Sequence, residues 1–164
     1  MIERMHTLLQ TLADKGQTLG CVESLSGGKF AAEACCFPGA SHVFKGGLVT
    51  YTPETKIALA HVKKITIDRF GIVSPSVASE MAIGGKKALG VDMCLSCTGN
   101  AGPTAQEGGA AVGDVCFALA YGGSVWTIQM SYGDIGREEI RNKTVKMMVE
   151  LGLSVFESTN IKLI

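Results

Sequence analysis

The sequence predicts an α/β fold in which helices cover both faces of a mixed sheet, as a three-layer α/β/α sandwich. In the first half of the chain, segments with helical apolar spacing alternate with short apolar runs, which is the order of strands joined by helices. Two further apolar runs follow, separated only by Gly122 and Gly123, and this spacing predicts a β-hairpin. A sheet that combines both kinds of connection is mixed.

The elements of the first half are set by apolar spacing and by the glycines and prolines that end them. In order, the sequence predicts a helix from Ile2 to Leu12, a strand over residues 18–23, a helix over 29–36, a strand over 42–51 and a helix that Pro53 opens. Gly46 and Gly47 lie within the second strand, where glycine indicates a bulge or the close approach of another part of the chain.

The second half begins with a strong helix signal over residues 76–90. Ser74 fits the N-terminal cap, Pro75 fits the first helical position, and Gly90 fits the C-terminal cap. The other predicted elements are a strand over 92–98, a glycine-rich loop over 99–113, hairpin strands over 114–121 and 124–132, a charged loop over 133–139, and a last amphipathic helix from Ile140 to Leu151.

Length and charge limit the classes of protein that fit. A chain of 164 residues is expected to form one domain, residues 1–164, with a core of its own. Fifteen basic and fifteen acidic residues give no net charge, so we expect a small-molecule substrate and neither a nucleic-acid nor a membrane partner. The amphipathic N-terminal segment is typical of neither a signal peptide nor a membrane span, which favours a cytoplasmic protein.

The apolar composition favours self-association. Hydrophobic residues make up 46% of the chain and charged residues only 18%, and the chain ends in the short, mostly apolar tail NIKLI, residues 160–164. We therefore expect a homo-oligomer.

The six cysteines do not form a metal-binding pattern. Cys94 and Cys97 are three residues apart in a predicted strand and so point to opposite faces, whereas a zinc site needs its sulfurs on one side. We expect no metal, and we expect reduced, buried thiols at Cys21, Cys35, Cys36, Cys94, Cys97 and Cys116. The glycine motifs of dinucleotide and nucleoside triphosphate sites are absent, so no cofactor is predicted.

Reactive side chains are concentrated in ESLSGG, residues 23–28, between a predicted strand and a predicted helix. One interpretation is that Ser26 simply caps the helix. The other is that a hydroxyl is presented at a helix N-terminus, where main-chain N–H groups can stabilise negative charge.

A serine nucleophile in this chain needs a base other than histidine, because the three histidines are scattered and have no acidic neighbours at ligand spacing. Lysine can serve when burial or a nearby cation lowers its pKa. Two pairs are open. Ser26 and Lys29 have S-x-x-K spacing on one helix face, whereas Ser24 and Lys56 lie on neighbouring loops that one sheet edge could bring together.

Six segments occur together and in a fixed order, which makes the set specific although each segment alone is modest evidence. They are ESLSGG (23–28), PGASHVFKGGLVTYTPETK (38–56), GIVSPSVASEMA (71–82), TGNAGP (98–103), VGDV (112–115) and GDIGREEIR (133–141). In these segments the chain resembles the C-terminal domain family of the competence/damage-inducible protein CinA, which also occurs as a stand-alone nicotinamide-nucleotide amidohydrolase. The resemblance runs from about Leu8 to about Phe156.

The resemblance implies hydrolysis, without a metal or cofactor, of the amide of nicotinamide mononucleotide to nicotinic acid mononucleotide and ammonia, a step in the recycling of pyridine nucleotides. Ser24 matches the serine of the family's E-S-x-T-G-G motif and would attack the amide carbon. Lys56 matches the lysine that follows the T-Y motif and would take the hydroxyl proton and return it to ammonia. Tyr51 would line the pocket and orient this pair.

Main-chain N–H groups would bind both the oxyanion and the 5′-phosphate in this interpretation. We expect the oxyanion donors near Ser26, Gly27 and Gly28. The candidates for the phosphate are Thr98, Gly99, Asn100, Ala101 and Gly102, together with the guanidinium groups of Arg137 or Arg141. The alternatives are a plain turn closed by Pro103 and solvated arginines on the last helix.

The chain departs from the family pattern at three places. Ser26 replaces the usual threonine and keeps its hydroxyl, two extra residues precede Arg137 and can displace it, and Ala110-Ala111 stand where a lysine is often found. These departures leave open a non-catalytic mononucleotide-binding or assembly module, and a purely structural domain is the third hypothesis.

Overall fold

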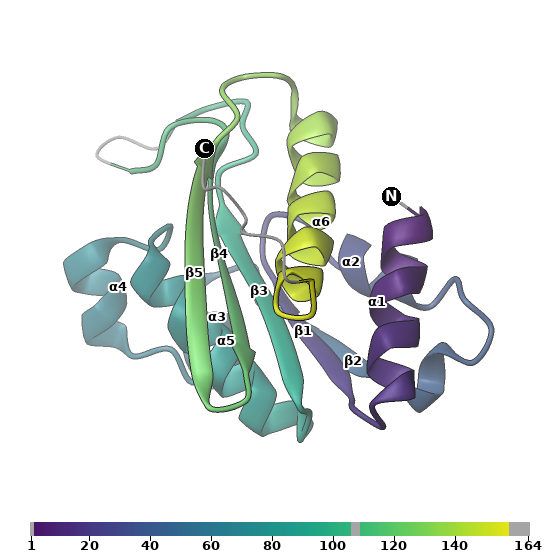
Figure 1. The fold of residues 1–164 in the computed structure, drawn as a ribbon. Coiled ribbons are helices and arrows are strands. Elements are labelled where there is room, and N and C mark those ends of the chain that lie inside the picture. The colour runs from purple at the N-terminus through teal and green to yellow at the C-terminus, as the bar shows by residue number, and fades with distance from the viewer. Residues whose placement is uncertain (1, 106–108, 158–164) are drawn as a thin grey trace.

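The computed structural model describes residues 2–105 and 109–157, and the five strands within these ranges form one sheet in the order β2-β1-β3-β4-β5 (Figure 1). The strands are β1 (Leu19–Glu23), β2 (Phe44–Val49), β3 (Met93–Gly99), β4 (Asp114–Tyr121) and β5 (Ser124–Ser131). β1 is parallel to both β2 and β3, whereas β4 is antiparallel to β3 and β5. The predicted mixed sheet is thereby confirmed. The C-terminal tail, residues 160–164, lies outside the described residues.

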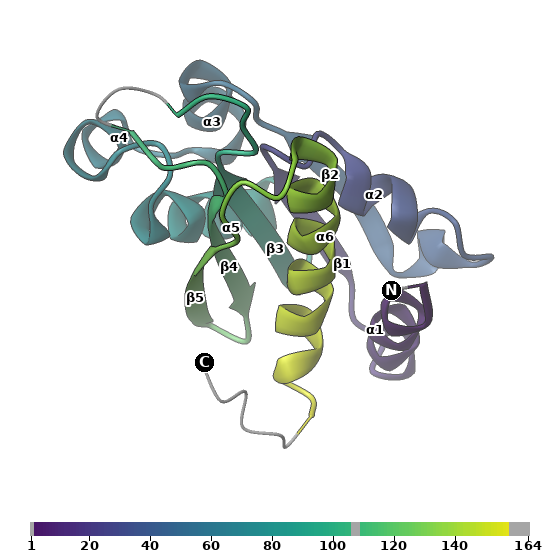
Figure 2. The ribbon, with the colours of Figure 1, turned by 90° about the horizontal axis from the view of Figure 1, so that it is seen from above.

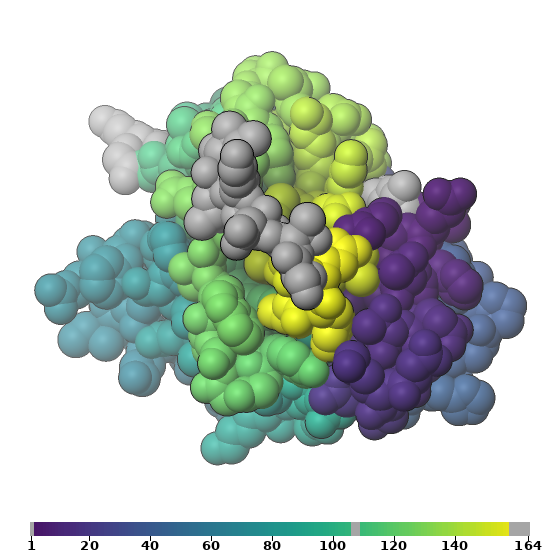
Figure 3. Space-filling model, in the orientation of Figure 1, coloured from purple at the N-terminus to yellow at the C-terminus, as the bar shows by residue number. Residues whose placement is uncertain are grey.

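Helices cover both faces of the sheet, which confirms the predicted three-layer fold. On one face lie α1 (Ile2–Asp14), α2 (Lys29–Ala34) and α6 (Arg137–Ser154), and on the other lie α3 (Pro53–Ala60), α4 (Lys64–Phe70) and α5 (Pro75–Leu89) (Figure 1 and Figure 2). α1 and α6 form the surface beside β5 on the side seen in Figure 3. Within the described ranges, no helix combines the length and apolar character that crossing a membrane requires.

The cysteines of β3 divide between the two apolar layers. Cys97 packs in the layer beneath α1 and α6, and Cys94 packs in the layer beneath α5, as the alternation of strand side chains predicts. The prediction that all six thiols are buried is wrong for Cys35 and Cys36. Both are exposed, and they lie just beyond the end of α2 at Ala34.

Local sequence signals correctly predicted the hairpin turn and both caps of α5. Gly122 and Gly123 have φ angles of 57° and 85°, the left-handed conformation that a two-residue hairpin turn requires. Ser74 Oγ accepts a hydrogen bond from the Val77 N–H, and Gly90 ends α5 with φ 63°.

The structure differs from the prediction at α4 and at the start of α6, among other places. α4 was not predicted, since its sequence KITIDRF carries β-branched residues and Lys63 supplies no side-chain cap. Its cap comes from the neighbouring helix, because the Glu80 carboxylate accepts hydrogen bonds from the Lys63 N–H and the Thr66 hydroxyl. α6 begins at Arg137 rather than after a loop over 133–139.

The carboxyl ends of the three parallel strands meet at one edge of the sheet. β2 is brought against β1 at Gly46 and Gly47, where both parts of the sequence prediction are confirmed: Lys45 is skipped in the pairing, and a Cβ on Gly47 would lie 2.6 Å from Cys21 Sγ. The segments that follow β1, β2 and β3 therefore share one edge, which is where ligand sites gather in such sheets.

α3, which carries Lys56, is placed by two features of its surroundings. Thr52 and Thr55 form a reciprocal capping box at its N-terminus. Its C-terminal end lies on α5 at Gly84, where an added Cβ would overlap the main-chain carbonyl of Ala60. The absence of a side chain at Gly84 thus lets α3 approach α5 closely.

Substituting Gly84 tests this contact. An alanine in a helix is ordinarily more stable than glycine by roughly 1 kcal/mol. Because the new methyl group has to displace a main-chain carbonyl, we expect Gly84→Ala instead to lower the free energy of unfolding by about 1–3 kcal/mol, measured by urea denaturation. Ile83→Ala, at a half-exposed position of the same helix, is the control and should cost less. A stabilised Gly84→Ala protein would contradict the proposed packing.

Candidate active site

Ser24 and Lys56 form a buried pair. Ser24 directly follows β1, Lys56 lies in the second turn of α3, and Lys56 Nζ is 2.8 Å from Ser24 Oγ. The ammonium also donates a hydrogen bond to the main-chain carbonyl of Thr50, just after β2. Two loops at the parallel edge and one helix therefore bring a hydroxyl and an amine into contact although they are 32 residues apart in the chain.

The surroundings change the chemistry of the lysine. Lys56 has no exposed surface, and burial, which disfavours a charged amine, lowers its pKa from the ordinary value of 10.5 to about 8. A substantial fraction of the amine is therefore neutral in mildly alkaline solution. In that form Nζ can accept the proton of the Ser24 hydroxyl.

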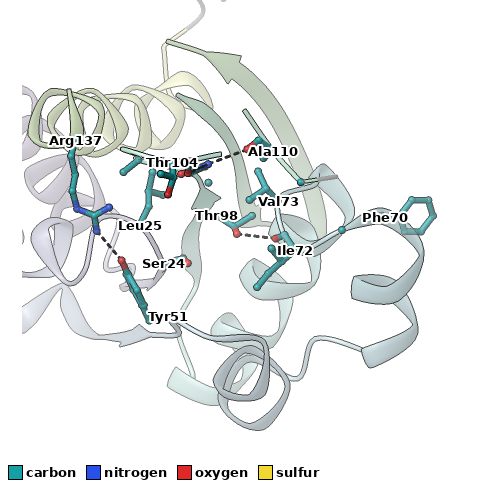
Figure 4. A pocket seen from close by; sticks show the side chains of 15 residues that line it. Ser24, Leu25, Tyr51, Phe70, Ile72, Val73, Thr98, Thr104, Ala110 and Arg137 are labelled. Carbon is teal, nitrogen blue, oxygen red and sulfur yellow. Dashed lines mark hydrogen bonds between the residues drawn. The ribbon is translucent and has the colours of Figure 1, made fainter. Parts of the chain in front are cut away.

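Ser24 opens onto a cavity of about 400 Å³ at the parallel edge of the sheet (Figure 4). The residues that line it are Ser24, Leu25, Tyr51, Phe70, Gly71, Ile72, Val73, Thr98, Gly99, Asn100, Ala101, Thr104, Gly109, Ala110 and Arg137. Within the described part of this lining, Arg137 is the only charged side chain. Lys56 is not part of the lining and contacts Ser24 from the interior.

Tyr51 and Arg137 lie on one side of the cavity and contact each other (Figure 4). Arg137 Nη2 donates to the Tyr51 hydroxyl at 2.8 Å, and Nη1 donates to the carbonyl of Gly102 at 2.7 Å. The two extra residues before Arg137 therefore leave its guanidinium at the cavity. Arg137 also links the segment after β2 to the segment after β3.

The segment TGNAG, residues 98–102, is shaped by its own hydrogen bonds. The Asn100 side chain donates to the carbonyls of Thr104 and Ala110 and accepts from the Gly102 N–H, while the Asn100 N–H donates to the Asp114 carbonyl. The Thr98 hydroxyl donates to the Ile72 carbonyl. Two of the N–H groups that were expected to bind an anion, those of Asn100 and Gly102, are thus used within the loop. Thr98, Gly99, Asn100 and Ala101 line the cavity, and Gly102 does not.

In the ESLSGG turn, neither the predicted Ser26 cap nor the Ser26–Lys29 pair is formed. Ser26 does not cap α2, because the N-cap is Gly28 and Ser26 Oγ lies 3.2 Å from Cys97 Sγ. Its pairing with Lys29 is not formed either, since Lys29 Nζ binds Glu138 at 2.6 Å. The Gly27 N–H donates to the Ser24 carbonyl, and none of Ser26, Gly27 and Gly28 lines the cavity.

Glu23 takes the capping position that the sequence assigned to Ser26. Its fully buried carboxylate accepts the N–H groups of Phe30 at 3.0 Å and of Ala31 at 2.9 Å. The first-turn donors of α2 are therefore occupied by a carboxylate of the protein itself. The signal that could have identified Glu23 is an acidic residue that ends a buried strand just before a helix N-terminus.

Arg141 also lies outside the cavity lining. Its Nη2 donates to the Ser26 carbonyl at 2.9 Å and its Nη1 donates to Glu138 at 2.8 Å. Of the two arginines considered for an anion, only Arg137 reaches the cavity. Arg141 is nevertheless not a solvated charge, since it contacts the turn that carries Ser24.

The fold and this site define a class: a three-layer α/β/α domain with a buried serine–lysine pair at the parallel edge of its sheet. The chain belongs to the CinA C-terminal domain family, whose model matches residues 2–155. A CinA-like protein of Petrotoga mobilis is 40% identical over 138 residues, which are 84% of this chain and 34% of that protein. The chain spans about a third of the length of such curated relatives.

Solved structures of the same family share the whole fold. The competence/damage inducible protein of Agrobacterium tumefaciens is 32% identical with a TM-score of 0.90, and the alignment covers 95% of both chains. A CinA superfamily protein of Escherichia coli is 29% identical with a TM-score of 0.91, over 94% of this chain and 90% of that chain.

Removal of the Glu23 carboxylate tests its capping function. Glu23→Ala leaves the Phe30 and Ala31 N–H groups without their acceptor, so we expect the free energy of unfolding to fall by about 1–3 kcal/mol in urea denaturation. Glu33→Ala, at a half-buried position within α2, the helix that Glu23 caps, is the control and should cost less, because alanine is favourable within a helix. Equal losses in the two variants would argue against the cap.

Proposed function

We propose that this chain is an amidohydrolase that converts nicotinamide mononucleotide to nicotinic acid mononucleotide and ammonia, with Ser24 as nucleophile and Lys56 as base. The observation that carries the proposal is the 2.8 Å contact between Lys56 Nζ and Ser24 Oγ beside the cavity. Membership of the CinA C-terminal domain family supports it, because resemblance to that family implies this activity. The lowered pKa of Lys56 supports it as well, since a base must be able to lose its proton near neutral pH.

In the first half of the proposed reaction, neutral Lys56 removes the Ser24 proton as Oγ attacks the carboxamide carbon. The resulting ammonium of Lys56 then gives this proton to the departing nitrogen, the C–N bond breaks, and ammonia leaves. An ester between the pyridine carboxyl carbon and Ser24 Oγ remains. The Thr50 carbonyl orients the lysine throughout, since it accepts a second hydrogen bond from Nζ.

In the second half, Lys56 removes a proton from water, and the hydroxide attacks the ester carbon. Ser24 Oγ leaves with the proton that Lys56 returns, and the carboxylic acid that forms releases its proton to solvent and dissociates as the carboxylate. Leu25 follows the nucleophile and lines the cavity, and its main-chain N–H is the proposed oxyanion donor in place of Ser26, Gly27 and Gly28. The first-turn N–H groups of α2 are unsuitable because Glu23 occupies them.

The cavity supports a small anionic substrate. Its volume of about 400 Å³ lies within the usual range of small-molecule sites. Arg137 offers a planar guanidinium suited to the 5′-phosphate, and it would exchange its contacts with Tyr51 and Gly102 for contacts with phosphate oxygens. Thr98 and Ala101 line the same cavity and complete the proposed substrate contacts.

Ammonia release from nicotinamide mononucleotide tests the nucleophile. Ser24→Ala should lower kcat by at least about a thousandfold, since no other group replaces the attacking oxygen. Ser26→Ala is the matched control: it removes the second hydroxyl of the same turn, which faces Cys97, and should retain activity within a few fold. Equal rates in wild type and Ser24→Ala would remove Ser24 from the mechanism. Tight binding of the mononucleotide without ammonia release would instead select the non-catalytic binding module.

The pH dependence of the rate tests the base. Because the neutral amine is the active form and it predominates above the pKa of about 8, kcat/KM should rise with pH and level off above that value. Below it, the increase should be about tenfold per pH unit. Lys56→Met should remove this dependence together with most of the activity. A wild-type profile that is flat, or that falls with rising pH through this range, would contradict a lysine base.

A further inference from the structure

The turn that carries Ser24 is held partly by a side chain of another element, α6. Between β1 and α2 the chain passes through Gly27 and Gly28, with φ angles of 64° and 91°, and the Gly27 N–H closes the turn on the Ser24 carbonyl at 3.0 Å. The Ser26 carbonyl accepts a longer bond of 3.3 Å from the Lys29 N–H and a shorter one of 2.9 Å from Arg141 Nη2. A side chain of α6 thus makes the shorter contact to the middle of the turn.

Arg141 is itself held in place. Glu138, one helical turn earlier, accepts a hydrogen bond from Arg141 Nη1 at 2.8 Å and forms an ion pair with Lys29 Nζ at 2.6 Å. Lys29 is the first residue of α2, so one carboxylate joins α2 to α6, which lie side by side in Figure 2. The Lys29 ammonium, followed by the Arg141 guanidinium, holds the pKa of Glu138 below its ordinary value, so this carboxylate remains charged at neutral pH.

The two arginines of α6 act on different loops. Arg137 and Arg141 are four residues apart and therefore lie on the same side of the helix. Arg137 reaches the segments after β2 and β3 through Tyr51 and Gly102, and Arg141 reaches the segment after β1 through Ser26. The first two turns of α6 consequently contact all three loops that end the parallel strands.

We propose that Arg141 is a positioning residue for Ser24: it fixes the nucleophile's turn through the Ser26 carbonyl and does not touch substrate. This inference rests on the proposed function for its kinetic readout. Partly exposed ion pairs contribute little to stability, whereas a displacement of about 1 Å at a reacting group can lower a rate by about a hundredfold. The effect of Arg141 is therefore expected in the rate of the chemical step and not in the stability of the fold.

Steady-state kinetics on the full chain test this role. Arg141→Met keeps a long, unbranched side chain but removes the guanidinium donors, and it should lower kcat by about 10- to 100-fold while KM stays within about twofold of wild type. Its unfolding midpoint should stay close to that of wild type. Arg141→Lys restores one cationic donor group and should recover part of the loss. Lys146→Met, which removes an exposed cation from the same helix, is the control and should leave both constants unchanged.

Three results would overturn the proposal. A raised KM with unchanged kcat would mean that Arg141 binds substrate. Unchanged constants in Arg141→Met would mean that the turn is held without it. A loss of kcat that simply follows a large drop in the unfolding midpoint would mean that Arg141 acts on overall stability.

A second readout separates this proposal from the proposed substrate. A fluorophosphonate probe phosphonylates an activated serine with loss of fluoride, and mass spectrometry of the peptide containing Ser24 gives the rate of labelling. Labelling of the wild type and slower labelling of Arg141→Met would support the positioning role even if nicotinamide mononucleotide released no ammonia. Equal labelling rates would refute the positioning role, and a wild type that is not labelled would refute it as well, because Ser24 would then have no activation to lose.

Discussion

The burial of Lys56 is the constraint around which this domain is arranged. A cation without exposed surface loses the hydration that water would give it, and this cost is reduced when the amine is neutral or hydrogen-bonded. Here the amine donates to the Ser24 hydroxyl and to the Thr50 carbonyl, and burial lowers its pKa to about 8. The serine and the lysine thus depend on each other. The hydroxyl gives the buried amine a partner, and the amine in its neutral form can accept the hydroxyl's proton.

The fold meets this constraint by bringing separate elements to one edge of the sheet. β1 delivers Ser24, β2 ends just before Thr50, and α3 carries Lys56 inward because Gly84 lets it lie close to α5. None of these elements alone could hold the pair, since its two members come from different layers. The parallel arrangement of the first three strands is therefore the part of the topology that the site requires, and the β4–β5 hairpin extends the same sheet away from it.

The features that sequence reasoning predicted correctly are those whose signals are local. The glycine pair of the hairpin, the Ser74 cap of α5 and the opposite faces of Cys94 and Cys97 each depend on a few neighbouring residues. α4 was missed because its cap, the Glu80 carboxylate, lies in another helix and leaves no mark on the segment itself. The close contact of Ser24 and Lys56 was a hypothesis from motifs that only the three-dimensional arrangement could test, since nothing local fixes a distance between residues 32 positions apart.

Non-local contacts also explain why only some of the groups predicted to bind the phosphate or the oxyanion line the cavity. A glycine-rich turn at a helix N-terminus predicts free N–H groups, but in this domain Glu23 occupies those of α2 and Asn100 occupies that of Gly102. Two arginines four residues apart are equivalent in sequence, and each donates to a main-chain carbonyl, yet only Arg137 also lines the cavity. Main-chain partners exist at every residue and so carry no sequence signature. Whether an arginine can reach a ligand or holds a loop is consequently decided by the loops that fold against it, and in this chain the proposed substrate contact and the proposed positioning residue share one helix.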